Sequence, residues 1–174
     1  MYLISIYFDE KTNRTIQQYI KKVAEQTGNT LMLDGNVPPH ITISAFETID
    51  EQAAINTMNC IVNKLQRGLL EWVSVGQFFP YVIFLSPVLN EYLHEMSVQI
   101  TNGLEKTDKI KISPYYQPFH WLPHTTIGKT LSKKEMKVAF DVLQNNFSRF
   151  SGEALRIGLA KPTPHRDIAS WELS

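Results

Sequence analysis

Two short segments of the chain share one pattern, Pro-His-Ile-Thr-Ile at residues 39–43 and Pro-His-Thr-Thr-Ile at residues 123–127. In each segment a proline precedes a histidine, and a threonine stands two positions after the histidine. Because alternate side chains of a β-strand point to the same face, the histidine and the threonine of each segment would share one face. The pattern predicts two strands that each bury mainly aliphatic side chains on one face and present an imidazole and a hydroxyl on the other.

The residues around the first segment predict the order β-α-β-α-β. An apolar run at the N-terminal end is typical of a buried strand, and apolar residues at helical spacing follow it. The expected elements are a strand at 2–8, a helix through 16–27 that stops at Gly28, a strand at 40–46, a helix from the capping residue Asp50 to Gly68, and a strand at 72–79.

The same order of elements repeats in the second half. The expected elements are a strand at 81–86, a helix at 88–104, a strand at 124–130, a helix opened by the capping box of Ser132 and Glu135, and strands at 154–160 and 168–173. The two histidine strands hold the same place in each copy. We therefore expect an α+β fold in a single two-lobed domain over residues 1–174, with approximate repeats at 1–80 and 81–174, pseudo-twofold symmetry and a central cleft.

Composition narrows the class of protein. A hydrophobic share of 43% is ordinary for a globular chain, and 17 basic residues balance 17 acidic ones. This balance argues against avid, non-specific binding to long nucleic acid. The single cysteine, Cys60, excludes a disulfide within the chain and a cysteine-based metal site. Residues 1–9 lack a basic leader, and no stretch approaches the roughly 18 apolar residues of a membrane span. We expect a monomeric, cytoplasmic protein without membrane association.

Two imidazoles and two hydroxyls in one cleft would suit a phosphodiester substrate. One imidazole must be neutral to accept a proton from water or an attacking hydroxyl, and the other must be protonated to give a proton to the leaving oxygen. Histidine can do either near neutral pH. The hydroxyls of Thr42 and Thr126 can donate hydrogen bonds to phosphate oxygens as charge develops there. His40 and His124 are therefore the candidate catalytic residues, and the chemistry needs no metal ion.

Other interpretations of the same residues stay open. A single His-x-Thr segment is weak evidence, because a histidine on a strand is more often structural. Two of the five histidines meet the full pattern, each after a proline, which makes coincidence a poor explanation. A non-catalytic nucleotide-binding or RNA-binding module could use the same cleft. A metallohydrolase could use the same histidines, although no carboxylate ligands stand near them in the sequence.

The two segments resemble the paired H-x-T-x signatures of the 2H phosphoesterase superfamily. The resemblance covers nearly the whole chain and is nearest to the branch of 2′-5′ RNA ligase-like proteins and RNA 2′,3′-cyclic phosphodiesterases. It implies catalysis by His40 and His124, phosphate binding by Thr42 and Thr126, no cofactor, and a nucleotide or short RNA with a cyclic or 2′-5′ phosphodiester as the partner.

The resemblance also raises the question of a basic residue after each signature. Five positions after the first histidine stands Ala45, and five positions after the second stands Lys129. If the strand continued regularly, its alternation would point Lys129 away from the catalytic face.

Three more residues are candidates for lining the cleft. Ser44 and Phe46 continue the alternation of His40 and Thr42, so they are expected on the same face. Tyr115 belongs to an aromatic segment before the second signature and could stack a nucleobase, or it could pack between the lobes.

Overall fold

The computed structural model describes residues 1–174. The chain forms eight strands and five helices, with short 3₁₀ turns at Val62–Lys64 and Pro114–Tyr116. The strands are β1 Tyr2–Phe8, β2 His40–Thr48, β3 Gly68–Phe78, β4 Val82–Pro87, β5 Ile110–Ile112, β6 Thr125–Gly128, β7 Phe150–Pro162 and β8 His165–Glu172. The helices are α1 Glu10–Thr27, α2 Leu31–Asp34, α3 Glu51–Ile61, α4 Glu91–Leu104 and α5 Lys133–Asn146.

All eight strands belong to one antiparallel sheet. Seven of them follow the order β5-β2-β1-β7-β3-β4-β6, and β8 pairs with residues 156–162 of β7. The long strands β3 and β7 change partners along their length. Residues 68–72 of β3 pair with residues 150–154 of β7, after which β3 continues beside β4 and β7 continues beside β1. On each side of the central β3–β7 pair, the first strand of one half is therefore followed by a histidine strand, as a pseudo-twofold axis requires.

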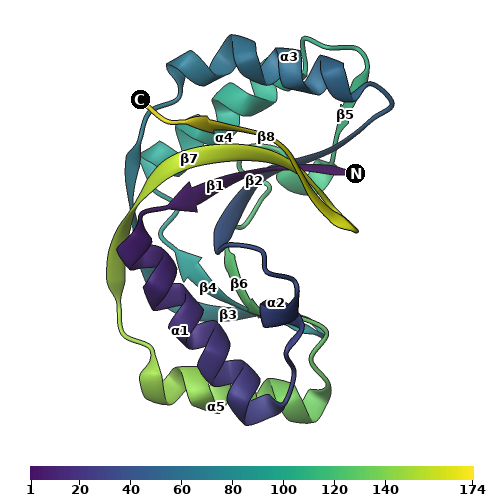
Figure 1. Cartoon of the computed structure of the whole chain (residues 1–174). Helices are drawn as coiled ribbons and strands as arrows, with labels where there is room; N and C mark the ends of the chain where they lie inside the picture. Colours follow the sequence, from purple (N-terminus) through teal and green to yellow (C-terminus); the bar gives the residue numbers. More distant parts are fainter.

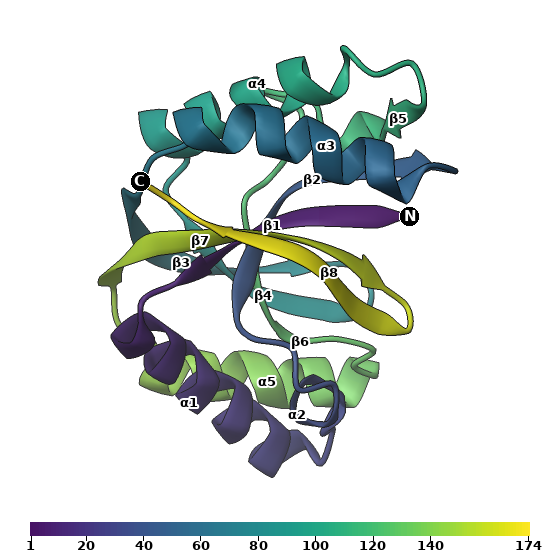
Figure 2. The same ribbon diagram turned by 45° about the horizontal axis from the view of Figure 1, so that its top comes forward.

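The helices also cross between the halves. Helix α1 packs on α5 and β6, whereas α4 packs on α3 and β2. The upper lobe in Figure 1 therefore combines β1, β2, β5, β7 and β8 with α3 and α4, and the lower lobe combines β3, β4 and β6 with α1 and α5. Figure 2 shows the two helix pairs on opposite ends of the molecule, with the sheet between them. The predicted two-lobed α+β fold is confirmed, but one sheet runs through both lobes and each lobe contains parts of both sequence halves.

Local sequence signals account for most element ends. The Asp9 carboxylate accepts a hydrogen bond from the Thr12 amide at 2.9 Å and begins α1, and Gly28 ends it in the left-handed conformation. The predicted capping box of Ser132 and Glu135 is present at the start of α5. Helix α3 is shorter than expected, because it ends at Ile61 and Gly68 begins β3 instead.

A continuous core of 33 buried residues extends through both lobes. Trp72, which is fully buried, stacks on Phe150 with ring centroids 4.9 Å apart and meets Phe8 edge-on at 5.0 Å. Because Trp72 lies where β3 passes from β7 to β4, this aromatic cluster fixes the junction of the two lobes. No helix combines the length and the hydropathy that crossing a lipid bilayer requires.

Candidate active site

The first histidine strand, β2, faces the cleft from the upper lobe. His40 lies opposite Tyr7 of β1, with ring centroids 6.0 Å apart, and Thr42 lies opposite Ser5. The hydroxyl oxygens of Thr42 and Ser5 are 3.2 Å apart, which is hydrogen-bonding distance. Ile41 points the other way into the core and is fully buried. The alternation of the first His-x-Thr segment therefore separates polar and apolar faces as expected.

The second histidine strand faces the cleft from the lower lobe. Thr126 lies opposite Phe84 of β4, and His124 stands one residue before the start of β6. The His124 ring meets Phe78 edge-on, with centroids 4.8 Å apart, and Phe84 at 5.3 Å. Thr125 is fully buried, and its hydroxyl accepts a hydrogen bond from the Trp72 indole at 3.1 Å. Thr125 therefore anchors the strand to the core, and Thr126 carries the hydroxyl on the cleft side.

Both imidazoles are held by the same backbone contact. Nδ1 of His40 lies 2.8 Å from the carbonyl oxygen of Pro38, and Nδ1 of His124 lies 2.8 Å from that of Leu122. Since a carbonyl oxygen only accepts, each Nδ1 must carry the proton of that bond. In the neutral imidazole, Nε2 is then the free acceptor, and in the cation Nε2 becomes a donor. Both histidines are thus fixed with Nε2 available for proton transfer.

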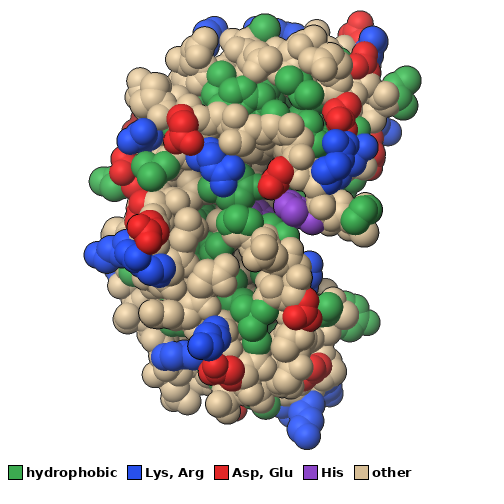
Figure 3. All heavy atoms as spheres, viewed as in Figure 1, with side chains coloured by type: hydrophobic (Ala, Val, Ile, Leu, Met, Phe, Trp, Pro, Cys, Tyr) green, Lys and Arg blue, Asp and Glu red, His purple; other side chains and the backbone are tan.

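One cavity joins the two lobes at this point. It has a volume of ≈ 180 Å³ and includes His40 from β2 and Thr126 from β6. Its full lining is Leu3, Ser5, Tyr7, Met32, Val37, His40, Thr126, Lys129, Ala160, Pro162 and His165. Of the four signature residues, His40 and Thr126 therefore line this cavity, whereas Thr42 and His124 do not. Figure 3 shows the hollow between the lobes, with histidine side chains at its upper rim. The chain folds so that residues 86 positions apart in sequence meet across a single opening.

The surroundings depress the basicity of both imidazoles. Burial lowers the pKa of His40 below its ordinary value of 6.5, the bond to Pro38 opposes this, and the positive charges of His124, His165 and Lys129 lower it further. Burial also lowers the pKa of His124, and the bond to Leu122 partly offsets the change. The positive charge of His124 is thus one of the causes that lower the pKa of His40.

The aromatic side chain of Tyr7 lies beside His40 in the upper lobe. Tyr7 is buried, and the Arg156 guanidinium lies 4.3 Å from its ring centroid. Burial and the charge of Asp167 raise the pKa of Tyr7, whereas Arg156 opposes the increase. Tyr7 therefore stays a neutral hydrogen-bonding phenol beside His40 at physiological pH.

Three candidate cleft residues lie elsewhere. An extra residue in β2 breaks the alternation between Thr42 and Ser44, so Ser44 falls opposite Ile4 and Phe46 opposite Tyr2. Both are buried on the core side, where Phe46 stacks on Tyr2 with centroids 5.6 Å apart. Tyr115 is 79% exposed on a 3₁₀ turn and is absent from the cavity lining. The expectation that these residues line the cleft is therefore wrong for Ser44 and Phe46 and is not supported for Tyr115.

Two basic side chains that were not among the predicted site residues, Lys129 and His165, line the cavity. Regular alternation would point Lys129 away from the cavity, but β6 ends at Gly128, so strand alternation no longer governs the next residue. His165 begins β8 and lies 3.3 Å from an Asp167 carboxylate oxygen. The sequence signals for these residues were the spacing of Lys129 from the second signature and the place of His165 in a proline-containing turn, where a solvated loop was the favoured interpretation.

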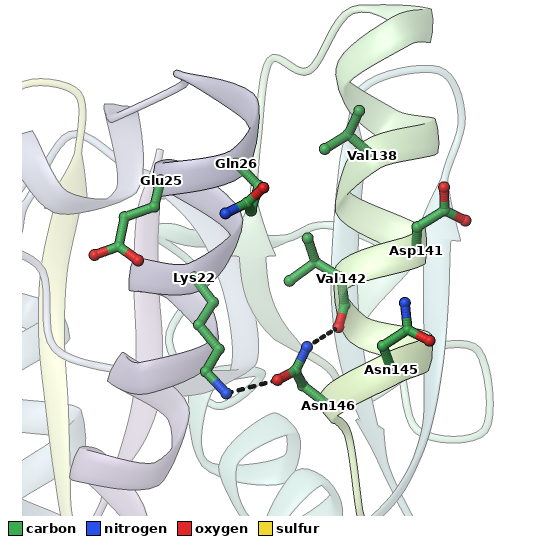
Figure 4. Close-up of a pocket in the computed structure, with 8 residues that line it drawn as sticks. All are labelled: Lys22, Glu25, Gln26, Val138, Asp141, Val142, Asn145 and Asn146. Carbon is green, nitrogen blue, oxygen red and sulfur yellow. Dashed lines mark hydrogen bonds between the residues drawn. The ribbon is translucent and has the colours of Figure 1, made fainter.

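A larger cavity, of ≈ 450 Å³, lies between α1 and α5 and is unconnected with the histidine strands. Figure 4 shows its polar lining, in which the Lys22 ammonium donates to the Asn146 side chain at 2.6 Å. Its lining contains no imidazole and no hydroxyl or thiol nucleophile. Furthermore, no group of three or more His, Cys, Asp or Glu side chains is placed to hold a metal ion anywhere in the chain.

Comparisons with known proteins agree with this geometry. The family model described as the 2′-5′ RNA ligase superfamily matches residues 9–165. No curated protein matches the chain in sequence. Among solved structures, E. coli LigT complexed with 3′-AMP superposes with a TM-score of 0.65 at 12% identity, covering 99% of this chain and 97% of that one. TT0787 of Thermus thermophilus gives a TM-score of 0.66 at 13% identity, with 99% and 97% covered.

A third solved structure, with a lower TM-score, also covers nearly the whole chain. Usb1 of Kluyveromyces marxianus gives a TM-score of 0.50 at 12% identity, covering 99% of this chain and 96% of that one. At these identities the structural matches establish the fold, and the sequence match over residues 9–165 establishes the family. The chain belongs to the 2′-5′ RNA ligase superfamily of 2H phosphoesterases.

Proposed function

We propose that the protein is a metal-independent phosphodiesterase that acts on cyclic or 2′-5′ phosphodiester bonds of nucleotides or short RNA. The observation that carries this proposal is the matched Nδ1 contact of His40 and His124, which leaves Nε2 of each imidazole free. An acid–base pair needs one nitrogen that accepts a proton and one that donates a proton, and this arrangement provides both.

The reaction we propose on a 2′,3′-cyclic phosphate is hydrolysis. One imidazole accepts a proton from water, whose oxygen then bonds to phosphorus. The bond from phosphorus to one ribose oxygen breaks, and that oxygen takes the proton of the other imidazole, which is cationic. The product is a phosphomonoester with a free ribose hydroxyl, and the two histidines have exchanged protonation states.

The threonines supply hydrogen bonds to the non-bridging oxygens, where charge accumulates in the transition state. The Thr126 hydroxyl makes no hydrogen bond within the protein, and Thr126 lines the cavity, so the hydroxyl is free for a ligand. Lys129 adds a positive charge in the same cavity and attracts a phosphate without requiring a basic molecular surface. Support for a nucleotide substrate also comes from LigT, whose structure contains 3′-AMP.

Mass-resolved assays on 2′,3′-cyclic nucleotides and on 2′-5′-linked dinucleotides test the proposal. We expect turnover of at least one substrate class in the presence of a chelator and its loss in His40→Ala and His124→Ala. His120→Ala, at an exposed position outside the cavity, is the matched control. Activity abolished by chelation and restored by a divalent metal would contradict the proposal. Nucleotide binding without any product would instead indicate a binding module.

A further inference from the structure

The turn between β3 and β4 carries an exposed aromatic pair next to the first turns of α5. Phe79 is 83% exposed and Tyr81 is 58% exposed. Phe79, Pro80 and Tyr81 share a surface depression with Lys133, Met136 and Lys137. The Leu131 amide donates to the Tyr81 carbonyl at 3.0 Å and ties this turn to the segment that leads into α5. We call Phe79, Tyr81, Lys133 and Lys137 the hairpin surface.

The charge of the hairpin surface is positive. Neither Lys133 nor Lys137 belongs to any of the eight ion pairs of the protein. Of the acidic residues nearby, Glu135 is engaged in the capping box with Ser132, and Asp141 lines the adjoining depression with Lys137. Two unpaired ammonium groups therefore flank two exposed rings on a protein whose net charge is zero.

The turn that carries the hairpin surface adjoins His124 through Phe78. Phe78, the last residue of β3, packs edge-on against the His124 ring, and Phe79 follows it directly on the outside of the turn. The cavity lined by Lys129 and His165 contains no residue of this turn. A chain that leaves the site on the His124 side would therefore meet Phe78 and then Phe79.

We propose that the hairpin surface binds single-stranded RNA that continues from the phosphodiester held in the cleft. This proposal rests on the proposed function and specifies its substrate as the end of an oligoribonucleotide. Exposed rings can stack successive bases of any sequence, and the lysines can contact the phosphates between them. A protein partner would make the unpaired lysines costly to bury, whereas an RNA strand neutralises them and leaves them at the solvent edge.

The test compares two substrates that present the same reacting group. One is a short oligoribonucleotide that ends in a 2′,3′-cyclic phosphate, and the other is the 2′,3′-cyclic mononucleotide of its terminal base. We expect the double variant Phe79→Ser with Tyr81→Ser to lower the ratio of kcat/KM for oligonucleotide over mononucleotide by about tenfold, since each stacked base contributes on this scale. Lys133→Gln with Lys137→Gln should lower the same ratio and flatten its salt dependence.

The matched control is Ile49→Ser with Lys106→Gln, which removes an exposed apolar side chain and an exposed lysine outside the hairpin surface. It should leave the ratio unchanged. All exchanged side chains are exposed, so the variants should unfold at the wild-type temperature. A ratio that is equal in the wild type and the hairpin variants would overturn the hairpin proposal and leave the proposed function intact.

A binding measurement separates the two proposals if no substrate is turned over. The anisotropy of a labelled oligoribonucleotide ending in a 3′-phosphate reports on the hairpin surface without any reaction. Binding that weakens about tenfold in the aromatic variant supports RNA binding even if the phosphodiesterase proposal fails. Unchanged RNA binding in the aromatic variant would overturn the hairpin proposal. So would a wild-type dimer that the aromatic variant abolishes while RNA binding persists.

Discussion

The two histidine strands hold the same His-x-Thr pattern against different neighbouring side chains. In the upper lobe, the row of opposed residues is His40, Tyr7 and Arg156, so the imidazole lies beside a phenol, and a guanidinium lies over the ring of that phenol. In the lower lobe, His124 is packed by Phe78 and Phe84. The duplicated scaffold thus fixes the imidazoles and hydroxyls, and the neighbouring strands set a polar environment for one and an apolar environment for the other.

A pair of glycines shows how closely the backbones correspond. Gly76 lies opposite Phe84, and a Cβ there would come within 2.5 Å of the Phe84 ring. Gly158 lies opposite Ser5 in the related place, and a Cβ there would come within 2.9 Å of the Tyr7 ring. In each lobe the missing side chain gives an aromatic ring room to lie across the sheet behind its histidine strand. The symmetry therefore extends from the signatures to the backbones of the strands behind them, although the side chains on those strands differ.

The largest expected effects come from the imidazoles. His40→Ala and His124→Ala should each lower kcat by about 10²–10⁴-fold, because each removes a proton-transfer step. Single-turnover rates of the two variants would measure this loss, and circular dichroism would check that both variants are folded like the wild type. If only one of the two variants lost activity, the equivalence of the two strands in catalysis would be wrong.

The two threonines should have similar effects on activity and different effects on stability. Thr126→Val should lower kcat by up to about 10²–10³-fold, as for loss of one oxyanion donor, and leave stability near wild type. Thr42→Val should lower activity similarly and also cost about 1 kcal/mol of unfolding free energy, because it leaves the buried Ser5 hydroxyl without its partner. Denaturant titrations of both variants, run beside the kinetics, would show whether only Thr42 has this double role.

Lys129 should act on one histidine more than on the other. Lys129→Gln should lower kcat/KM by about 10- to 100-fold through loss of a charged contact to the phosphate. Because the charge of Lys129 lowers the pKa of His40, its removal should also move one arm of the pH profile to higher pH. Lys134→Gln, an exposed lysine of α5 outside the cavity, is the control. A uniform loss of rate with no movement of either arm would show that Lys129 acts on the substrate alone.

The smallest effect concerns stability. Both imidazoles have a pKa below 6.5 in the folded state, so the unfolded chain binds more protons as the pH falls through that value. Stability is therefore full above pH 6.5 and is lost as the pH falls through the two lowered pKa values. The double variant His40→Gln with His124→Gln should lose less stability between pH 7.5 and pH 5, measured by urea midpoints.

The sequence predicted what depends on local pattern. The apolar runs, the Gly28 stop and the Ser132 capping box each correspond to an observed element or boundary. The short elements α2 and β5 lacked a pattern long enough to detect. The crossing of α1 and α4 between lobes was also beyond sequence reasoning, because an amphipathic stripe does not identify the sheet that covers it.

The parts of the candidate site that lie on regular strands could be predicted from the sequence, and the parts at strand irregularities could not. The His-x-Thr spacing places both side chains on one face of β2 because that strand is regular from His40 to Thr42. One residue later the bulge reverses the faces, so Ser44 and Phe46 turn to the core. Lys129 reaches the cavity because β6 ends before it. In both places an irregularity of the strand, which alternation alone cannot reveal, determines the lining.

The most direct test of the account is the pH dependence of kcat/KM on a 2′,3′-cyclic nucleotide in the presence of a chelator. An acid–base pair of imidazoles requires one neutral and one protonated group, so the profile should be a bell whose two apparent pKa values belong to the pair. The lowered pKa values of His40 and His124 place the centre of the bell below pH 6.5, and replacing either histidine with glutamine should flatten one arm. A rate that rises steadily towards alkaline pH, without an acidic arm, would contradict the two-histidine mechanism.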